Sequence, residues 1–151
     1  MEPDLITRLQ AAVGESYQIE REFASGGQSR LFIANDAMAP RKVVIKLLPP
    51  EVSGAVEAER FKREIRVASR LEHPNIARLL DGGLAADGRP YLVLERVEGE
   101  PIVAWCRAQR SDLAARLRLV IAVAEAVDLA HRNLVVHRDL NVRRDVPRVM
   151  A

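Results

Sequence analysis

The amino-acid sequence predicts an α+β fold, in which a five-stranded antiparallel sheet with one inserted helix is followed by a smaller helical part. Three observations support this prediction. Short strand patterns fill most of the chain up to residue 97, a single helical pattern interrupts them, and only helical patterns follow the linker at Glu98-Gly99. Strands that are grouped before helices are typical of an α+β arrangement with two unequal parts.

The first elements are a short helix and a strand. Residues 5–13 have an amphipathic helical pattern that Gly14 would end. Residues 17–23 alternate in strand fashion. The side chains expected on one side of this strand are Tyr17, Ile19 and Arg21.

A hairpin and three further strands are expected next. Small residues at 24–29 predict a turn, and residues 31–35 resume as the second strand of a hairpin whose tip carries glycine. Residues 42–48 form the third strand pattern. The remaining strands are expected at 76–80 and 91–94, joined through Gly82-Gly83 and a turn at Asp87-Gly88.

The helical patterns are distinct from these strands. Residues 57–71 place apolar side chains on one stripe, and Pro74 bars the helix from continuing. After the linker, residues 101–108 predict a short helix and residues 113–127 a long one with a wide apolar face. The stripe of the first helix consists of Phe61, Ile65, Ala68 and Leu71, and the N-cap of the last is expected at Asp112 or Ser111.

Composition sets broad limits on the function. A chain of 151 residues with a formal net charge of +2 predicts one domain of ordinary size and no general role in binding nucleic acid. Cys106 is the single cysteine, so no disulfide forms within the chain and a reducing cytoplasm is the expected location. The acidic N-terminus does not resemble a signal peptide, and no apolar run is long enough to predict a membrane span.

A lysine in the third strand is the first candidate for chemistry. Because side chains alternate along a strand, Val44 and Lys46 are expected on one face and their apolar neighbours on the other. A lysine is seldom buried without a partner, because the loss of its water is costly. Glu64 beside the apolar stripe is the best-placed carboxylate on the inserted helix, and Glu57 is less central. The alternative is a lysine that extends into solvent at the edge of a strand.

Two further motifs suggest a function. Gly26 and Gly27 allow backbone amides to approach a phosphate without an intervening Cβ, although a Gly-Gly hairpin tip is also an ordinary turn. His137-Arg138-Asp139-Leu140 follows the long helix. Its position after that helix and its spacing from Lys46 argue against a chance match.

Together these motifs resemble the protein-kinase family, and within it the bacterial serine/threonine kinases, over residues 17–140. Val43-Val44-Ile45-Lys46 is similar to the lysine strand of the family, and Arg63-Glu64-Ile65 to its helix glutamate. Residues 72–76 resemble the turn after that helix, and residues 91–99 the fifth strand and the hinge. His137-Arg138-Asp139-Leu140 resembles the opening of the catalytic loop.

The resemblance implies a domain that transfers the γ-phosphoryl group of ATP, with Mg²⁺, to serine or threonine hydroxyls of a protein substrate. Asp139 would be the catalytic base, Lys46 would hold the α- and β-phosphates, and Glu64 would pair with Lys46. Leu94 would be the gatekeeper, and the adenine would bond to the backbone of the hinge. The implied nucleotide-binding residues are Ala24, Gly26, Gly27, Leu31, Val44, Lys46, Leu94, Glu95 and Val97.

The sequence also departs from the family pattern. The glycine loop reads Ala24-x-Gly26-x-x-Ser29-x-Leu31, so one of the family's three glycines is kept. Asn141 stands where a lysine is expected, Arg144 stands where a magnesium-holding asparagine is expected, and no Asp-Phe-Gly follows. Since guanidinium offers no lone pair to a metal, no metal site is expected. We therefore expect weak ATP binding and no kinase activity from this chain alone.

The expected organisation is an N-terminal extension over residues 1–14 and a kinase N-lobe with its hinge over 15–97. A partial C-lobe over 98–140 and an aberrant tail over 141–151 would follow, as in a truncated domain. An incomplete C-lobe would expose the apolar face of the long helix, which predicts self-association. Two alternatives stay open. One is a pseudokinase-like module that binds a nucleotide or a partner, and the other is the non-functional product of a truncated or frame-shifted gene.

Overall fold

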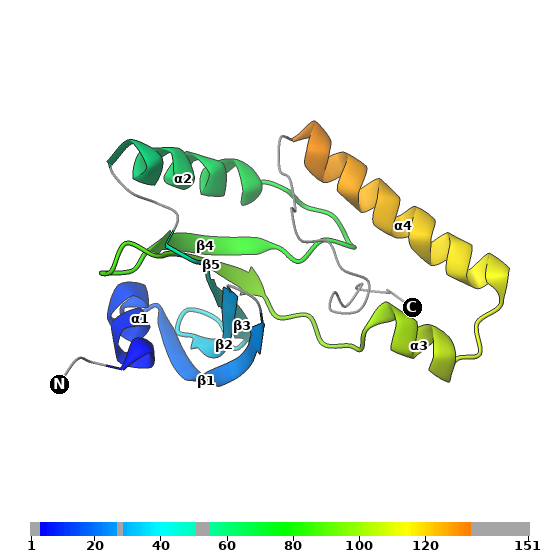
Figure 1. The fold of residues 1–151 in the computed structure, drawn as a ribbon, viewed down its shortest axis with the longest axis horizontal. Coiled ribbons are helices and arrows are strands. Elements are labelled where there is room, and N and C mark those ends of the chain that lie inside the picture. Colours follow the sequence, from blue (N-terminus) through cyan, green and yellow to red (C-terminus); the bar gives the residue numbers. More distant parts are fainter. Residues whose placement is uncertain (1–3, 27–28, 51–54, 134–151) are drawn as a thin grey trace. The chain divides into compact units, whose positions relative to one another are not determined.

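The computed structural model describes residues 4–26, 29–50 and 55–133 (Figure 1). It contains two compact units, one formed by residues up to 69 together with 79–96 and the other by residues 70–78 and those from 97 onward. Among the described residues, the first unit holds five strands and two helices, and the second holds two helices. This composition confirms the predicted α+β class and the five-stranded sheet.

The sheet is antiparallel at every pairing, in the order β1-β2-β3-β5-β4, so β1 and β4 are its edges. β4 and β5 form a hairpin, and β5 is the strand of this hairpin that pairs with β3. The strands are β1 (Tyr17–Gly26), β2 (Ser29–Asp36), β3 (Lys42–Leu47), β4 (Leu79–Leu84) and β5 (Pro90–Glu95).

The first helix, α1 (Leu5–Val13), has the predicted bounds. Gly14 ends it with φ of 62°, in the left-handed region that glycine adopts without strain, and its N–H donates to the Gln10 carbonyl at 3.0 Å. Leu9 and Val13 of α1 are buried against one face of the sheet. The sheet residues in the same core are Tyr17, Ile19, Phe32, Ala34, Val43, Ile45, Leu47, Tyr91 and Val93.

The predicted hairpin is confirmed, but its strands extend further into residues 24–29 than expected, because strand pairing continues from Ala24 to Gly26 and resumes at Ser29. Backbone hydrogen bonds between strands do not require large side chains, so a run of small residues can still pair. Gly27 and Gln28, which lie between the paired ends, are outside the described residues.

The expected alignment of Arg21 with Tyr17 and Ile19 is also wrong. A bulge in β1 shifts the register between Ile19 and Arg21, and Arg21 is exposed while the other two are buried. The extra residue in a bulge reverses the alternation of side chains beyond it, which a simple period of two does not anticipate.

The fourth strand begins later than predicted. Residues 76–78 are not part of β4, and the Ile76 N–H donates to the His73 carbonyl at 3.1 Å in a turn. Gly82 and Gly83, which were expected to join two strands, lie inside β4. A glycine within a strand allows another group to approach closely, and here both positions face a close neighbour.

The remaining helices are α2 (Ala55–Ala68), α3 (Ile102–Ala108) and α4 (Leu113–Arg132). α2 ends before the predicted Leu71, and the Ser69 hydroxyl donates to the Arg66 carbonyl at 3.1 Å. α4 extends beyond the predicted Val127. Asp112, one of the two candidates, is its N-cap and accepts a hydrogen bond from the Ala115 N–H at 2.7 Å. Within the described ranges, no helix has the length and apolar character needed to cross a membrane.

Candidate nucleotide-binding face

The two sides of β3 differ as predicted. Val43, Ile45 and Leu47 are buried in the core beneath α1. Val44 and Lys46 are half-buried on the opposite face. The alternation of a strand therefore places the lysine on the face that α1 does not cover.

The strand register places several predicted site residues side by side. Lys46 is opposite Leu31 of β2 and opposite Leu92 of β5. Leu31 is in turn opposite Ala24 of β1, and Leu92 is opposite Gly82 of β4. Opposed residues in antiparallel strands share one face and lie about 4.5–5.5 Å apart. These five residues therefore form one row across the whole sheet, with Lys46 in its centre.

A second row lies next to the first on the same face. Val44 is opposite Ile33 of β2 and opposite Leu94 of β5, which is opposite Leu79 of β4. Val44 and Leu94 are half-buried, like Leu31 in the first row. An apolar surface beside an ammonium group suits a ligand with a flat apolar base and an anionic end.

Sequence analysis missed Leu92, although its position two residues before Leu94 on a strand puts both on one face.

α2 packs on the β4 end of the first row. A Cβ added to Gly82 would lie 2.6 Å from Cδ1 of Ile65. Ile65 of α2 therefore packs against the backbone of β4 at a position where the strand has no side chain. Ile65 is half-buried there, as are Phe61 and Ala68 of the predicted stripe.

The expected pairing of Lys46 with Glu64 is not formed in this structure. The Glu64 side chain is 63% exposed and accepts a hydrogen bond from Arg60 of its own helix at 3.1 Å. In the part of the chain that the structure describes, no hydrogen bond or ion pair joins Glu64 to Lys46. The prediction that Glu64 lies at the packed border is therefore wrong. Successive residues of a helix point about 100° apart, and Ile65 is the one that faces the sheet.

Three other predicted site residues lie outside the described residues, namely Gly27, Asp139 and Arg144. Gly26 is opposite Ser29 at the end of the hairpin. Glu95 is the last residue of β5, and Val97 belongs to the second unit. The adenine contacts expected from the backbone of these last two residues stay predictions.

Among the described residues, no group of three or more histidine, cysteine, aspartate or glutamate side chains could hold a metal ion.

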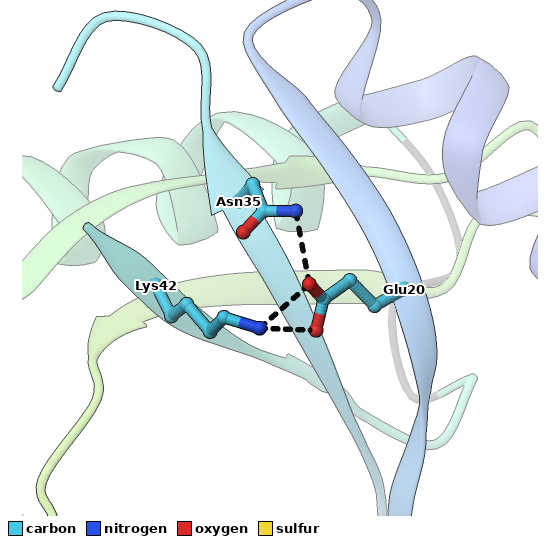
Figure 2. A network of polar contacts seen from close by, with 3 residues as sticks. All are labelled: Glu20, Asn35 and Lys42. Carbon is cyan, nitrogen blue, oxygen red and sulfur yellow. Dashed lines mark hydrogen bonds and ion pairs between the residues drawn. The ribbon is translucent and has the colours of Figure 1, made fainter. Parts of the chain in front are cut away.

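A second lysine on the same face is already neutralised (Figure 2). Nζ of Lys42 donates to the two carboxylate oxygens of Glu20 at 2.6 and 2.7 Å, and Nδ2 of Asn35 donates to the same carboxylate at 3.1 Å. Two hydrogen bonds hold the pKa of Glu20 below its usual range. The one from Lys42 has the larger effect and the one from Asn35 the smaller. Among the described residues, no such partner is found for Lys46.

This sheet, with its inserted helix and a lysine on the open face of its third strand, defines a protein-kinase fold. The family model for the protein kinase domain matches residues 17–143. The chain is 34% identical over 139 residues to the serine/threonine-protein kinase PknA of Mycobacterium tuberculosis, covering 88% of this chain and 32% of that protein. It is 35% identical over 126 residues to the serine/threonine-protein kinase PrkC of Bacillus subtilis, covering 82% of this chain and 19% of that protein.

The crystal structure of the M. tuberculosis PknI kinase domain matches with a TM-score of 0.67 and 28% identity, over 83% of this chain and 51% of that domain. The chain belongs to the protein-kinase family, and its named relatives are bacterial serine/threonine kinases. It spans at most about a third of the length of these curated relatives and about half of the solved kinase domain.

Proposed function

We propose that this chain contains the nucleotide-binding part of a serine/threonine protein kinase and that its ligand is ATP. Lys46 would contact the α- and β-phosphates, while Leu31, Val44 and Leu94 would contact the adenine. The backbones of Ala24, Gly26 and Gly27 would approach the phosphates, those of Glu95 and Val97 would bond the adenine edge, and Asp139 would orient the substrate hydroxyl.

The observation that carries this proposal is the position of Lys46 in the centre of a cross-strand row, beside the apolar second row. An ammonium group that has no carboxylate partner in the described residues and is surrounded by half-buried leucines is well placed to bind an anion. An ATP molecule can satisfy both parts of this face at once. In this proposal Glu64 would pair with Lys46 only after α2 rotates about its own axis.

Calorimetric titration with ATP tests the site, using two matched lysine variants. We expect Lys46→Ala to weaken ATP binding by at least about tenfold, because a hydrogen bond to a charged group is lost. Lys42→Ala removes the same charge from the same face of the same strand, four positions away, and should leave binding unchanged. Equal affinities for the wild type and Lys46→Ala would show that the assigned site is wrong.

We further propose that ATP binding is weak and that this chain does not transfer phosphate by itself. The loop keeps Gly26 but has Ala24 and Ser29 in place of two family glycines, and Arg144 replaces a residue expected to hold magnesium. A sub-micromolar ATP affinity would contradict the first part. Phosphorylation of a generic protein substrate that is abolished by Asp139→Asn would contradict the second.

A binding module without chemistry is the second candidate, and the replacements at Asn141 and Arg144 favour it. A pseudokinase-like module would still show a rise in melting temperature with nucleotide. A chain with no function would show neither that rise nor a sharp unfolding transition, so one thermal melt with and without ATP separates the two.

The proposed protein partners are a substrate, in a complete kinase, and a second copy of this chain. α4 exposes an apolar stripe formed by Leu113 (72%), Leu117 (52%), Val120 (60%) and Ile121 (56%). Its first half carries Arg116 and Arg118, and its second half carries Glu125, whereas Asp128 is already paired with Arg132 of the same helix at 2.7 Å. Antiparallel pairing of two copies would place Glu125 of one copy near the arginines of the other. Leu117→Glu should abolish dimers in sedimentation experiments, whereas Arg118→Glu should retain the apolar contact. A wild-type monomer at high concentration would contradict this proposal.

The lobe boundaries at residues 15–97 and 98–140, the separate tail at 141–151 and the cytoplasmic location are also proposals. Cys106, the single cysteine of the sequence, is buried and free, which is compatible with a reducing compartment.

A further inference from the structure

β1 is an edge strand of the sheet. Among the described residues it pairs with β2 alone, because it is the first strand in the order of the sheet. An edge strand leaves backbone N–H and C=O groups without partners, and these groups need hydrogen bonds from elsewhere.

The side chain of Gln10 supplies those hydrogen bonds. Its amide nitrogen donates to the Tyr17 carbonyl at 2.8 Å, and its amide oxygen accepts from the Ile19 N–H at 2.8 Å. The same nitrogen donates to the Gly14 carbonyl at 2.9 Å. The Gln10 amide thus replaces the peptide group of a missing neighbour strand at the first residues of β1.

α1 also contacts strands of the sheet other than β1. It contacts both edge strands, β1 and β4, and lies beside β1 in Figure 1. The Tyr91 hydroxyl of β5 donates to the Ala12 carbonyl at 3.3 Å. These contacts hold α1 against the base of the hairpin and against β5.

α1 lies outside the part of the chain that the family model matches, because the match covers residues 17–143 and α1 precedes them. An element outside the matched region nonetheless supplies Leu9, one of the most buried side chains of the molecule. It also caps the base of the strand whose other end carries Ala24 and Gly26.

We infer that α1 is a positioning element for the nucleotide-binding hairpin, and that Gln10 is the positioning residue that fixes the base of β1. The physical reason is that an edge strand with an uncapped base opens more easily from β2 and so takes its tip out of position. The effect on ATP rests on the proposed function, whereas the effect on β1 itself does not.

Hydrogen exchange of the full chain without nucleotide tests the effect on β1. Gln10→Ala should increase exchange of the Ile19 amide by about fivefold, with smaller increases toward Gly26 and no change in β3 or β5. The control is Gln18→Ala, which truncates an exposed glutamine of β1 itself. Gln10→Glu is a second variant, since its carboxylate still accepts from Ile19 but cannot donate to Tyr17. It should protect the Ile19 amide and still weaken the base of the strand.

ATP titration of the same variants tests the effect on binding. Gln10→Ala should weaken ATP binding by about threefold at a temperature where the variant is folded, and Gln18→Ala should not. Exchange that rises uniformly over the sheet, or not at all, would overturn the inference. If the wild type binds no ATP, the proposed function fails while the exchange result still decides the role of Gln10. Unchanged ATP affinity in a Gln10→Ala protein with a loosened β1 would overturn the link to binding.

Discussion

The two faces of the sheet differ in what covers them. On the α1 face, Phe32, Val43, Ile45 and Val93 are fully buried, each with 0% exposure. On the other face Lys46 and its apolar neighbours are only half-buried. The N-terminal helix α1 closes one face of the sheet, whereas the residues around Lys46 on the other face are less buried. The core residues and the proposed ligand-binding residues therefore alternate along the same strands.

The largest expected effect comes from opening the closed face. Leu9→Ala removes a side chain that is 1% exposed and should lower the free energy of unfolding by about 2–5 kcal/mol. Met38→Ala truncates a large apolar side chain that is 90% exposed and should change the free energy of unfolding by less than about 0.5 kcal/mol. Urea denaturation of both variants measures the two values. Similar losses would show that α1 does not close the core.

An intermediate effect is expected from two adjacent glycines of β4 that face opposite sides of the sheet. A Cβ on Gly83 would lie 2.8–3.1 Å from Oη, Cζ and Cε1 of Tyr91, a buried ring on the α1 face. A Cβ on Gly82 would meet the end of the Ile65 side chain on the other face, although the Tyr91 carbonyl lies 3.0 Å away.

Gly83→Ala should therefore destabilise the protein by about 1–3 kcal/mol, because the aromatic ring cannot move without losing its packing. Gly82→Ala should cost less, since the Cδ1 end of Ile65 can rotate away. Thermal unfolding of the two variants compares their losses of stability. A larger loss for Gly82→Ala would show that the Ile65 side of β4 tolerates a methyl group less well than the Tyr91 side.

Much of the fold follows from the sequence because its signals are local. The helix pattern that Gly14 ends, the alternation around Lys46 and the cap of α4 each depend on a few neighbouring residues. The first two predictions were correct, and Asp112 is one of the two caps that were expected. The errors arise where a long-range contact decides. The start of β4 depends on its pairing with β5, and the side on which Arg21 lies depends on a bulge opposite β2.

The candidate site shows the same division. Lys46 is placed by the period of its own strand. The direction of the Glu64 side chain depends on the rotation of α2 about its axis. That rotation is set by the packing of Ile65 against Gly82, which the sequence of the helix alone does not predict. The role of Gln10 follows only once β1 is known to be an edge, which is a property of the strand order.

The smallest expected effect concerns the ion pair on the open face. Lys42→Ala removes the partner of Glu20 and should lower the melting temperature only slightly at neutral pH, because both side chains are partly exposed and salt screens them. The pH dependence gives the sharper test. Lys42 lowers the pKa of Glu20 in the folded protein, so the pair stabilises the fold above the unfolded pKa of glutamate. That stabilisation is lost as pH falls through the lowered pKa. The difference in melting temperature between wild type and Lys42→Ala should therefore be present at neutral pH and vanish in acid. A difference that persists in acid, or that is unaffected by salt, would show that Lys42 contributes through packing, as the residues of the closed face do.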